Sequence, residues 1–286
     1  MFEAFPPKSV VVGIDGSRAA IRAAQWAVHE VAGTDTPLRL LYTREPNPHA
    51  DRSVSCRLLA AGEEAVHEAY AAVEAMGKSI KVEIDIVQGH PIPTLIEAAT
   101  STRLLCIGNT ESGNACANGF GSTAAKLVQS AQCPVAVVRG DRHADLTDNR
   151  PIVTLVDGSP EDDAALEWGF EEASRRNAPL VLMTAYRTGF DLLQEDHILH
   201  DHERRMRAAL DRYIATRAPH YPEVQLDAVT AFDTFLSYLA DHATTIQLAI
   251  VGAHRTSEIC QLVGPSGAVA LGHSDFSLLV ARSPCK

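Results

Sequence analysis

The sequence predicts an α/β fold of two doubly wound domains in tandem, each built on a parallel sheet. Two observations predict it. The chain repeats one pattern, and within each copy short aliphatic runs alternate with longer amphipathic ones. Such alternation is typical of parallel strands joined by helices. A length of 286 residues also suits two domains of ordinary size.

The repeat can be read directly from the letters. The run "VVVGIDGSRAAIRAAQWAVHEVA" returns as "IVTLVDGSPEDDAALEWGFEEAS", which places Asp15 and Asp157 in the same D-G-S, 142 positions apart. Later, "RLLCIGNTESGNAC" matches "QLAIVGAHRTSEIC" at an offset of 144. Because the offset is nearly constant, we expect two copies of one domain, over residues 1–141 and 150–286, with "GDRHADLTDNRP" as the linker.

In the first copy the expected strands are nearly continuous apolar runs, as they are when helices cover both faces of a sheet. These strands cover residues 9–15, 38–43, 81–87, 103–108 and 134–139. The expected helices lie between them, over residues 18–32, about 55–76, 94–100 and 122–132. Pro93 is expected in the first turn of the third helix, where a missing N–H has no consequence.

Composition narrows the classes of partner. A hydrophobic fraction of 46% predicts a folded chain with a sizeable core, and a net charge of −11 disfavours nucleic acid and anionic membranes. No run approaches the roughly 20 apolar residues that span a bilayer. Six scattered cysteines without a C-x-x-C pair suit a reducing compartment. We therefore expect a cytoplasmic protein that binds neither nucleic acid nor membrane.

Two residues mark the place where a ligand is expected. Asp15 ends the first strand and Gly108 ends the fourth. Ligands of open parallel sheets bind beyond the carboxyl ends of the strands, where the chain order reverses. If the two strands are neighbours, both residues face one crevice, and the Asp15 carboxylate can accept hydrogen bonds from a hydroxyl or an amine.

The loop after Gly108 predicts a phosphate site. It contains glycines, which let backbone N–H groups approach a ligand, and it ends at Gly121, Ser122 and Thr123, where a helix is expected to begin. A helix start adds unpaired N–H groups and the positive end of the helix dipole. Taken alone, each motif also fits a simpler interpretation, in which D-G-S is a helix N-cap and the loop is only a connection.

These residues resemble the universal stress protein family in its tandem form, over nearly the whole chain. The resemblance rests on "VVVGIDGS", on "VQGHPIPTLIEAA" and on a G-x2-G-x9-G-[ST] pattern. It implies the adenine nucleotide alpha hydrolase-like fold. In family members that bind ATP, an aspartate meets the ribose and adenine side, and the Gly loop wraps the phosphates. The matching residues here are Asp15, Gly108, Gly121, Ser122 and Thr123, with Thr43, just past the second strand, at the adenine.

The first copy departs from the family pattern at one position. Glu111 stands where the second loop glycine is expected, which brings a negative charge near the phosphates. Like charges repel, so ATP affinity should fall unless Mg²⁺ bridges the two groups or Glu111 points outward. ADP and AMP are alternative ligands.

The second copy departs further. Its corresponding loop, residues 252–266, has Arg255 at the second glycine, closes one residue earlier at Gly264, and continues with Pro265, which lacks a backbone donor. Arg255 and His254 can instead supply positive charge. The resemblance thus places a degenerate site at Asp157, Gly252, Arg255 and Gly264.

Other constellations have simpler explanations. His197, His200 and His202 suggest a metal site, since imidazoles at i and i+3 of a helix share a face, but a solvated helix surface explains them better. Cys116 and Cys260 occupy matching loop positions, which invites a redox role, although small residues are ordinary in loops. No catalytic triad, P-loop or loop lysine is present, so the sequence does not support catalysis.

The expectation is a cytoplasmic stress-response sensor or regulator that binds adenine nucleotide mainly in its first copy. A scaffold with decayed sites and a weak ATPase are the alternatives. We also expect the two domains to pair as an internal pseudo-dimer through the edges of their fifth strands, because unpaired backbone groups lie there. Pairing of two chains and an unidentified regulatory protein partner are further expectations.

Overall fold

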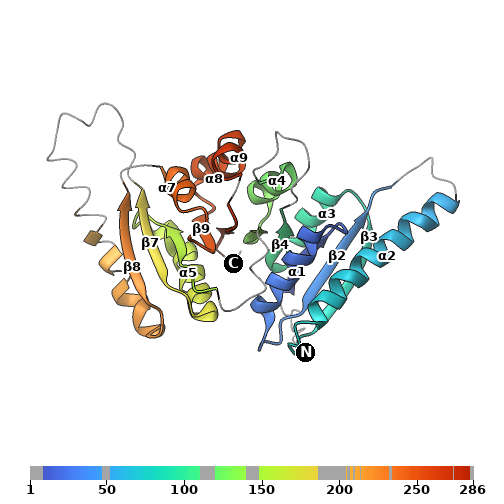
Figure 1. Ribbon diagram of the computed structural model, residues 1–286, viewed down its shortest axis with the longest axis horizontal. Helices are drawn as coiled ribbons and strands as arrows, with labels where there is room; N and C mark the ends of the chain where they lie inside the picture. The colour runs from blue at the N-terminus through green and yellow to red at the C-terminus, as the bar shows by residue number, and fades with distance from the viewer. Residues whose placement is uncertain are drawn as a thin grey trace, which may run out of the picture.

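A sheet that crosses both copies organises the molecule (Figure 1). The computed structural model describes residues 9–46, 52–109, 120–139, 148–185, 204, 207–208, 210–212, 214–231, 234–272 and 274–283. Within these residues ten strands form one sheet in the order β3-β2-β1-β4-β5-β10-β9-β6-β7-β8. Each half of that order belongs to one copy, and the second half runs in mirror order to the first.

The first copy is doubly wound, as predicted. Its elements are β1 (Ser9–Ile14), α1 (Arg18–Val31), β2 (Leu38–Arg44), α2 (Arg52–Glu74), β3 (Val82–Gln88), α3 (Pro91–Ala98), β4 (Thr102–Gly108), α4 (Ser122–Ser130) and β5 (Val135–Val138). All its strand pairs are parallel, and the chain order reverses between β1 and β4. A crevice is expected at this reversal.

The second copy repeats this arrangement. Its elements are β6 (Ile152–Leu155), η1 (Pro160–Asp162), α5 (Asp163–Arg176), β7 (Leu180–Ala185), η3 (Ala218–His220), β8 (Leu226–Ala231), α7 (Phe235–Asp241), β9 (Leu248–Gly252), α8 (Thr256–Val263), α9 (Pro265–Ala270) and β10 (Ser277–Ala281). The order reverses between β6 and β9, so the second copy has a crevice at the same place.

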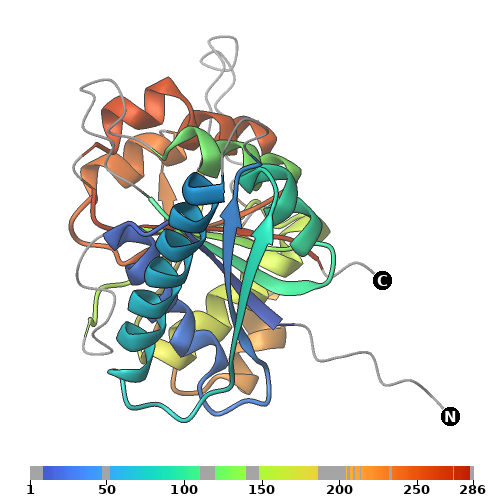
Figure 2. The same cartoon turned by 90° about the vertical axis from the view of Figure 1, so that its right-hand side faces the viewer.

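Helices cover both faces of the sheet, which explains the continuous apolar strands. Val10 and Val12 point into a cluster beneath α1, α2 and α5, whereas Val11 points into a second cluster beneath α3, α4, α7 and α8. Figure 2 shows α1 and α2 lying along one face. Within the described residues, none of the helices has the length and apolar character needed to cross a bilayer.

Some predicted helix ends were wrong by a few residues. α3 begins at Pro91, three residues before the expected start, because Pro91 itself takes the first helical position. α2 begins at Arg52 instead of about residue 55, and α4 ends at Ser130 instead of residue 132. The strand predictions are within about two residues of the observed strands.

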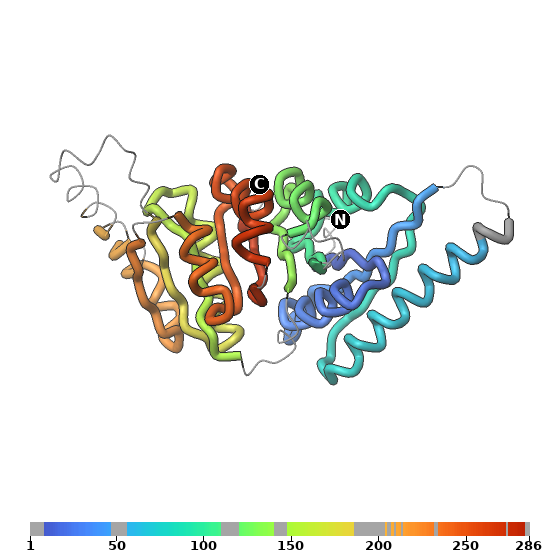
Figure 3. The backbone as a smooth tube through the Cα atoms, turned by 45° about the horizontal axis from the view of Figure 1, so that its top comes forward, coloured from blue at the N-terminus to red at the C-terminus, as the bar shows by residue number. Residues whose placement is uncertain are grey.

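The two copies join through their last strands. β5 and β10 pair antiparallel, with Leu279 opposite Ala136, so the predicted pairing of the fifth-strand edges is present. Figure 3 shows α4 beside α8 at this joint. Each copy also sends an arginine to the other: Arg139 Nη1 donates to the carbonyl of Leu271 at 2.9 Å, and Arg282 Nη2 donates to the carbonyl of Val128 at 2.6 Å.

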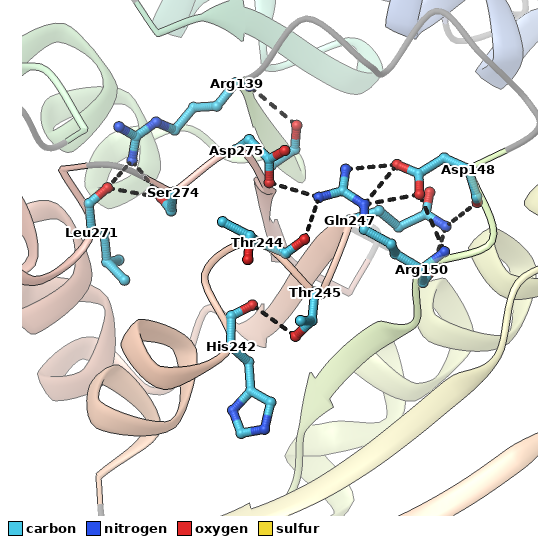
Figure 4. Close-up of polar contacts among 11 residues, drawn as sticks. Arg139, Asp148, Arg150, His242, Thr244, Thr245, Gln247, Leu271, Ser274 and Asp275 are labelled. Atoms are coloured by element: carbon cyan, nitrogen blue, oxygen red, sulfur yellow. Dashed lines mark hydrogen bonds and ion pairs between the residues drawn. The ribbon is translucent and has the colours of Figure 1, made fainter.

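Residues 148–150, at the end of the linker, form hydrogen bonds and ion pairs with the second copy (Figure 4). Arg150 forms ion pairs with Asp148 at 2.7 Å and Asp275 at 2.6 Å, and its Nη1 donates to the carbonyl of Thr244. Gln247 Nε2 donates to the carbonyls of Asp148 and Arg150. These contacts fix where the chain enters β6.

A buried ionic cluster lies between α1 and α5, away from the crevices. Glu30 and Glu172 occupy equivalent positions in the two copies, and both are buried. The second copy supplies two cations: Arg175 Nη1 lies 2.8 Å from Glu30 Oε2, and Arg176 Nε lies 2.8 Å from Glu172 Oε2. The Arg176 guanidinium also lies 4.9 Å from the centre of the Trp26 ring.

Candidate functional site

The crevice of the first copy gathers three predicted site residues at one edge of the sheet. Ile14 pairs with Tyr42 in β2, and Gly13 pairs with Ile107 in β4. Asp15, Thr43 and Gly108 therefore stand at neighbouring carboxyl ends of three strands. Thr43 lies within β2, which runs to Arg44, and not just past the strand as expected.

The D-G-S turn combines a helix cap with an exposed carboxylate. Gly16 has φ of +80°, a conformation that favours glycine. Ser17 caps α1, since its Oγ accepts a hydrogen bond from the Ala20 N–H at 3.1 Å. Asp15 Oδ1 accepts from the Ser17 N–H at 2.9 Å, while Asp15 itself stays exposed. The N-cap interpretation is therefore correct for Ser17 and leaves the Asp15 carboxylate at the mouth of the crevice.

Gly108 has a packing role that the sequence did not indicate. A Cβ atom at this position would lie 2.2 Å from the Ala19 carbonyl carbon and 2.5 Å from the Ala20 nitrogen, both in the backbone of α1. Only glycine lets the start of α1 approach the end of β4 this closely. This close packing brings the D-G-S turn up to the loop that follows Gly108.

Asn109 closes the base of the predicted phosphate loop, and sequence reasoning missed it. It is 4% exposed, and its Oδ1 accepts a hydrogen bond from the Gly121 N–H at 3.1 Å. Its own N–H donates to the Val138 carbonyl at 2.9 Å. The amide side chain thus ties the two ends of the loop together. An asparagine directly after a buried strand was the available signal. Glu111 and Cys116 lie outside the described residues.

The start of α4 lacks a side-chain cap. Gly121 is the N-cap residue with φ of −57°, so its backbone does not need glycine. Among the described residues, a Cβ atom there would meet Asn109 Oδ1, at 3.9 Å. Ser122 and Thr123 are exposed in the first turn. Uncapped N–H groups and the helix dipole make this end suitable for an anion.

The second copy has a cavity of about 490 Å³ at its crevice. The lining residues are Leu155, Asp157, Gly158, Ser159, Ala185, Thr234, Phe235, Arg255, Glu258 and Gln261. Asp157 is the counterpart of Asp15, and Ala185 that of Thr43. The structure therefore places Asp157 and Arg255 together, as the resemblance implied.

The positive charge expected from Arg255 is already balanced inside the protein. Arg255 Nη2 lies 2.6 Å from Asp162 Oδ1 and 3.1 Å from Asp157 Oδ2. Asp162 is fully buried, and its Oδ2 accepts hydrogen bonds from the N–H groups of Asp157 at 2.6 Å and Gly158 at 3.1 Å. His254 Nε2 lies 3.4 Å from Asp162 Oδ1. Arg255 and His254 therefore both face Asp162, the residue that sequence reasoning missed, and the charge that they were expected to offer to a ligand stays a prediction.

These contacts keep Asp157 ionised and oppose the effect of burial on Asp162. Burial raises the pKa of Asp162, against the nearby charge of Arg255. Burial also acts on Asp157, but hydrogen bonding with Ser159 and the charge of Arg255 lower the pKa of its carboxyl below the ordinary value. The cavity therefore contains a carboxylate anchored by an internal cation.

The predicted loop of the second copy is mostly a helix. α8 occupies residues 256–263 because Ile259, Leu262 and Val263 recur at helical spacing and are buried, and no glycine interrupts them. Gly264 ends α8, and Pro265 begins α9. A Cβ atom at Gly252 would meet the His254 ring at 2.5 Å, and one at Gly264 would meet the Cys260 carbonyl oxygen at 2.4 Å. Both glycines thus serve local packing.

No group of His, Cys, Asp and Glu side chains suited to a metal ion is found within the part of the chain that the structure describes. His197, His200 and His202 lie outside that part. Cys260 is an exposed thiol on α8.

The sheet order and the repeated domain define a tandem α/β protein of the doubly wound class. The family model "Universal stress protein family" matches residues 7–139 and again 148–282, so the chain belongs to that family and carries two of its domains. It is 38% identical over 282 residues to the universal stress protein Rv2028c of Mycobacterium tuberculosis, covering 98% of each chain. It is 34% identical to Rv2624c of the same organism, covering 96% of each chain.

A solved structure shares the fold. The universal stress protein of Archaeoglobus fulgidus aligns with a TM-score of 0.69 over 96% of each chain, at 13% identity.

Proposed function

We propose that this chain is a cytoplasmic stress-response sensor that binds an adenine nucleotide in the crevice of its first copy. The observation that carries the proposal is the pairing of two features at one switch point. Asp15 presents an exposed carboxylate whose hydrogen-bond partner among the described residues is the Ser17 N–H. The second feature is the start of α4, which has no side-chain cap among the described residues and is held next to the end of β4 by the bond from the Gly121 N–H to Asn109.

The chemistry of these groups fits the parts of a nucleotide. The Asp15 carboxylate can accept hydrogen bonds from ribose hydroxyls. The N–H groups of Ser122 and Thr123, with the two hydroxyls, can bind phosphate oxygens, while the Gly121 N–H donates to Asn109. The backbone near Thr43 would meet the base. Because Glu111 adds negative charge to the loop, we propose ADP or AMP beside ATP as ligands, and Mg²⁺ as the ion that would bridge Glu111 and a longer phosphate chain.

Sensing requires a route from the ligand to a partner, and α4 supplies one. Its first turn would hold the phosphate, and near its end the Val128 carbonyl accepts a hydrogen bond from Arg282 of the second copy. A ligand that orders the start of α4 therefore acts on an element already joined to the other domain. We propose that a regulatory protein, or a second copy of this chain, binds at this contact between the two domains and responds to the bound ligand.

One observation favours a second candidate, a scaffold that binds proteins without nucleotide. In the second copy, Asp157, Asp162 and Arg255 satisfy one another, so that crevice has lost the cationic character of a phosphate site. A weak ATPase is the third candidate, and no specific observation favours it.

Nucleotide titrations of the full chain test the proposal. We expect ATP, ADP or AMP to raise the melting temperature and to bind in calorimetry, with Mg²⁺ mattering most for ATP. Asp15→Ala and Gly121→Glu should each weaken binding by about tenfold or more, since one removes a charged acceptor and the other adds a like charge. Asp157→Ala, the matched change in the second copy, should weaken nucleotide binding by less than about twofold. Equal losses at both aspartates, or no binding of any nucleotide, would contradict the proposal and favour the scaffold.

A further inference from the structure

The lining of the cavity in the second copy differs from the nucleotide site proposed for the first copy and suits another class of ligand. We propose that it binds an uncharged ligand rich in hydroxyl groups, of the nucleoside class, and rejects the phosphorylated form. The inference relies on the proposed function only for the position of the crevice in the fold. The residues that line the second cavity provide the evidence.

The size and walls of the cavity suit a small organic ligand. A volume of about 490 Å³ lies within the range of known small-molecule sites. Leu155, Ala185 and Phe235 give it an apolar wall at the ends of β6 and β7 and the start of α7. A flat heterocycle packed on this wall would remove apolar surface from water.

The polar side of the cavity recognises hydroxyl groups. The Asp157 carboxylate lines the cavity, is held by Arg255, and keeps 45% of its side chain exposed. An ionised carboxylate accepts several hydrogen bonds, and those from hydroxyls to a charged acceptor are stronger than neutral ones. Because the ion pair fixes Asp157 in advance, a ligand need not spend binding free energy on ordering it.

Phosphate meets two obstacles in the same cavity. The first is charge: Glu258, in the first turn of α8, lines the cavity together with Asp157, while Arg255, the one arginine among the described lining residues, is paired with two carboxylates. An entering phosphate would therefore approach net negative charge.

The second obstacle is the loss of backbone donors. The N–H groups of Asp157 and Gly158 donate to the buried Asp162 and are unavailable to a ligand. Ala20, the equivalent of Asp162 in the first copy, has no such acceptor. Pro265, at the start of α9, has no N–H at all.

Calorimetry with adenosine and AMP tests the inference. The titrations use the full chain carrying Asp15→Ala, so that the first crevice contributes little. We expect adenosine to bind at least about tenfold more tightly than AMP. Adding Asp157→Ala should weaken adenosine binding by about tenfold or more. The matched control is Asp163→Ala, which removes an exposed carboxylate that pairs with Arg217 outside the cavity, and it should change the affinity by less than about twofold.

A second variant tests the charge argument without disturbing the ion pair. Glu258→Gln should improve AMP affinity by about fivefold while leaving adenosine unchanged. The inference is overturned if adenosine does not bind at about 10 mM, if AMP binds as tightly as adenosine, or if Asp157→Ala leaves adenosine affinity intact. The proposed function of the first copy fails in a different way. In that case the wild-type chain and Asp15→Ala have the same affinity for AMP.

Discussion

The two crevices of this chain share a backbone and differ in chemistry. Both follow a strand with D-G-S, both place that glycine at φ of +80°, and both lie where the strand order reverses. In the first, the position five residues after the aspartate is Ala20. In the second it is Asp162, which binds two backbone N–H groups and Arg255. This one buried carboxylate satisfies the N–H groups and the arginine of the second turn from inside the protein.

The comparison extends to the segment after the fourth strand. In the first copy, Asn109 ties together the ends of a long loop, and α4 begins without a side-chain cap. In the second copy, α8 fills much of that segment and Gly264 leads directly into α9. A repeated motif therefore preserves the strand and the turn more faithfully than it preserves the site.

The largest expected effect separates the glycines that end the two strands. Gly108→Ala would force a Cβ atom against the α1 backbone, which cannot move without shifting the helix, so we expect a loss of about 4 kcal/mol in the free energy of unfolding. In Gly252→Ala the contact is with the His254 ring, a side chain that can rotate away, so the loss should stay below about 1 kcal/mol. Urea unfolding of the full chain measures the loss in both variants. Equal losses would show that the two glycines contribute equally to packing.

The next effect concerns the ion pair of the second copy. Arg255→Met leaves Asp162 buried without its cation, which should lower the free energy of unfolding by about 3 kcal/mol at pH 7. Changing Asp162 to Asn in the same variant removes the uncompensated charge and should restore part of that loss. Arg217→Met is the matched control, because its partner Asp163 is exposed and the pair contributes little. A loss no greater than that of the control would mean that Arg255 is not needed to hold Asp162.

Much of the fold followed from sequence, and the reasons are local. Apolar runs placed the strands of the first copy, and the D-G-S repeat placed the two crevices, since periodicity and turn chemistry act over a few residues. The roles of Gly108 and Asp162 did not follow, because they depend on contacts with Ala19 and Arg255 that only the folded chain brings together. α8 could have been foreseen, since Ile259, Leu262 and Val263 stand at helical spacing; the expectation of a loop there came from the resemblance alone.

The last effect concerns the buried ionic cluster between α1 and α5, where the equivalent glutamates Glu30 and Glu172 differ in pKa. Burial, aided by the charge of Glu172, raises the pKa of Glu30 to about 8. Despite burial, the charges of Arg176 and Arg175 lower the pKa of Glu172. Above the ordinary carboxyl pKa of 4.5 and up to about 8, the folded chain keeps a proton on Glu30 that the unfolded chain has lost. The free energy of unfolding contributed by Glu30 is therefore fully present below pH 4.5 and is lost as the pH rises through about 8.

Glu30→Gln removes this titration, because glutamine stays neutral at every pH. Between pH 5 and pH 8 the wild-type chain should lose about 3 kcal/mol more of its free energy of unfolding than the variant does. Glu171→Gln, next to the cluster on α5 but partly exposed, is the control and should keep the wild-type slope. Urea unfolding at pH 5, 6.5 and 8 measures the three slopes. If Glu30→Gln and the wild-type chain share one slope, Glu30 is ionised in the folded protein, and the cations of the second copy stabilise both glutamates equally.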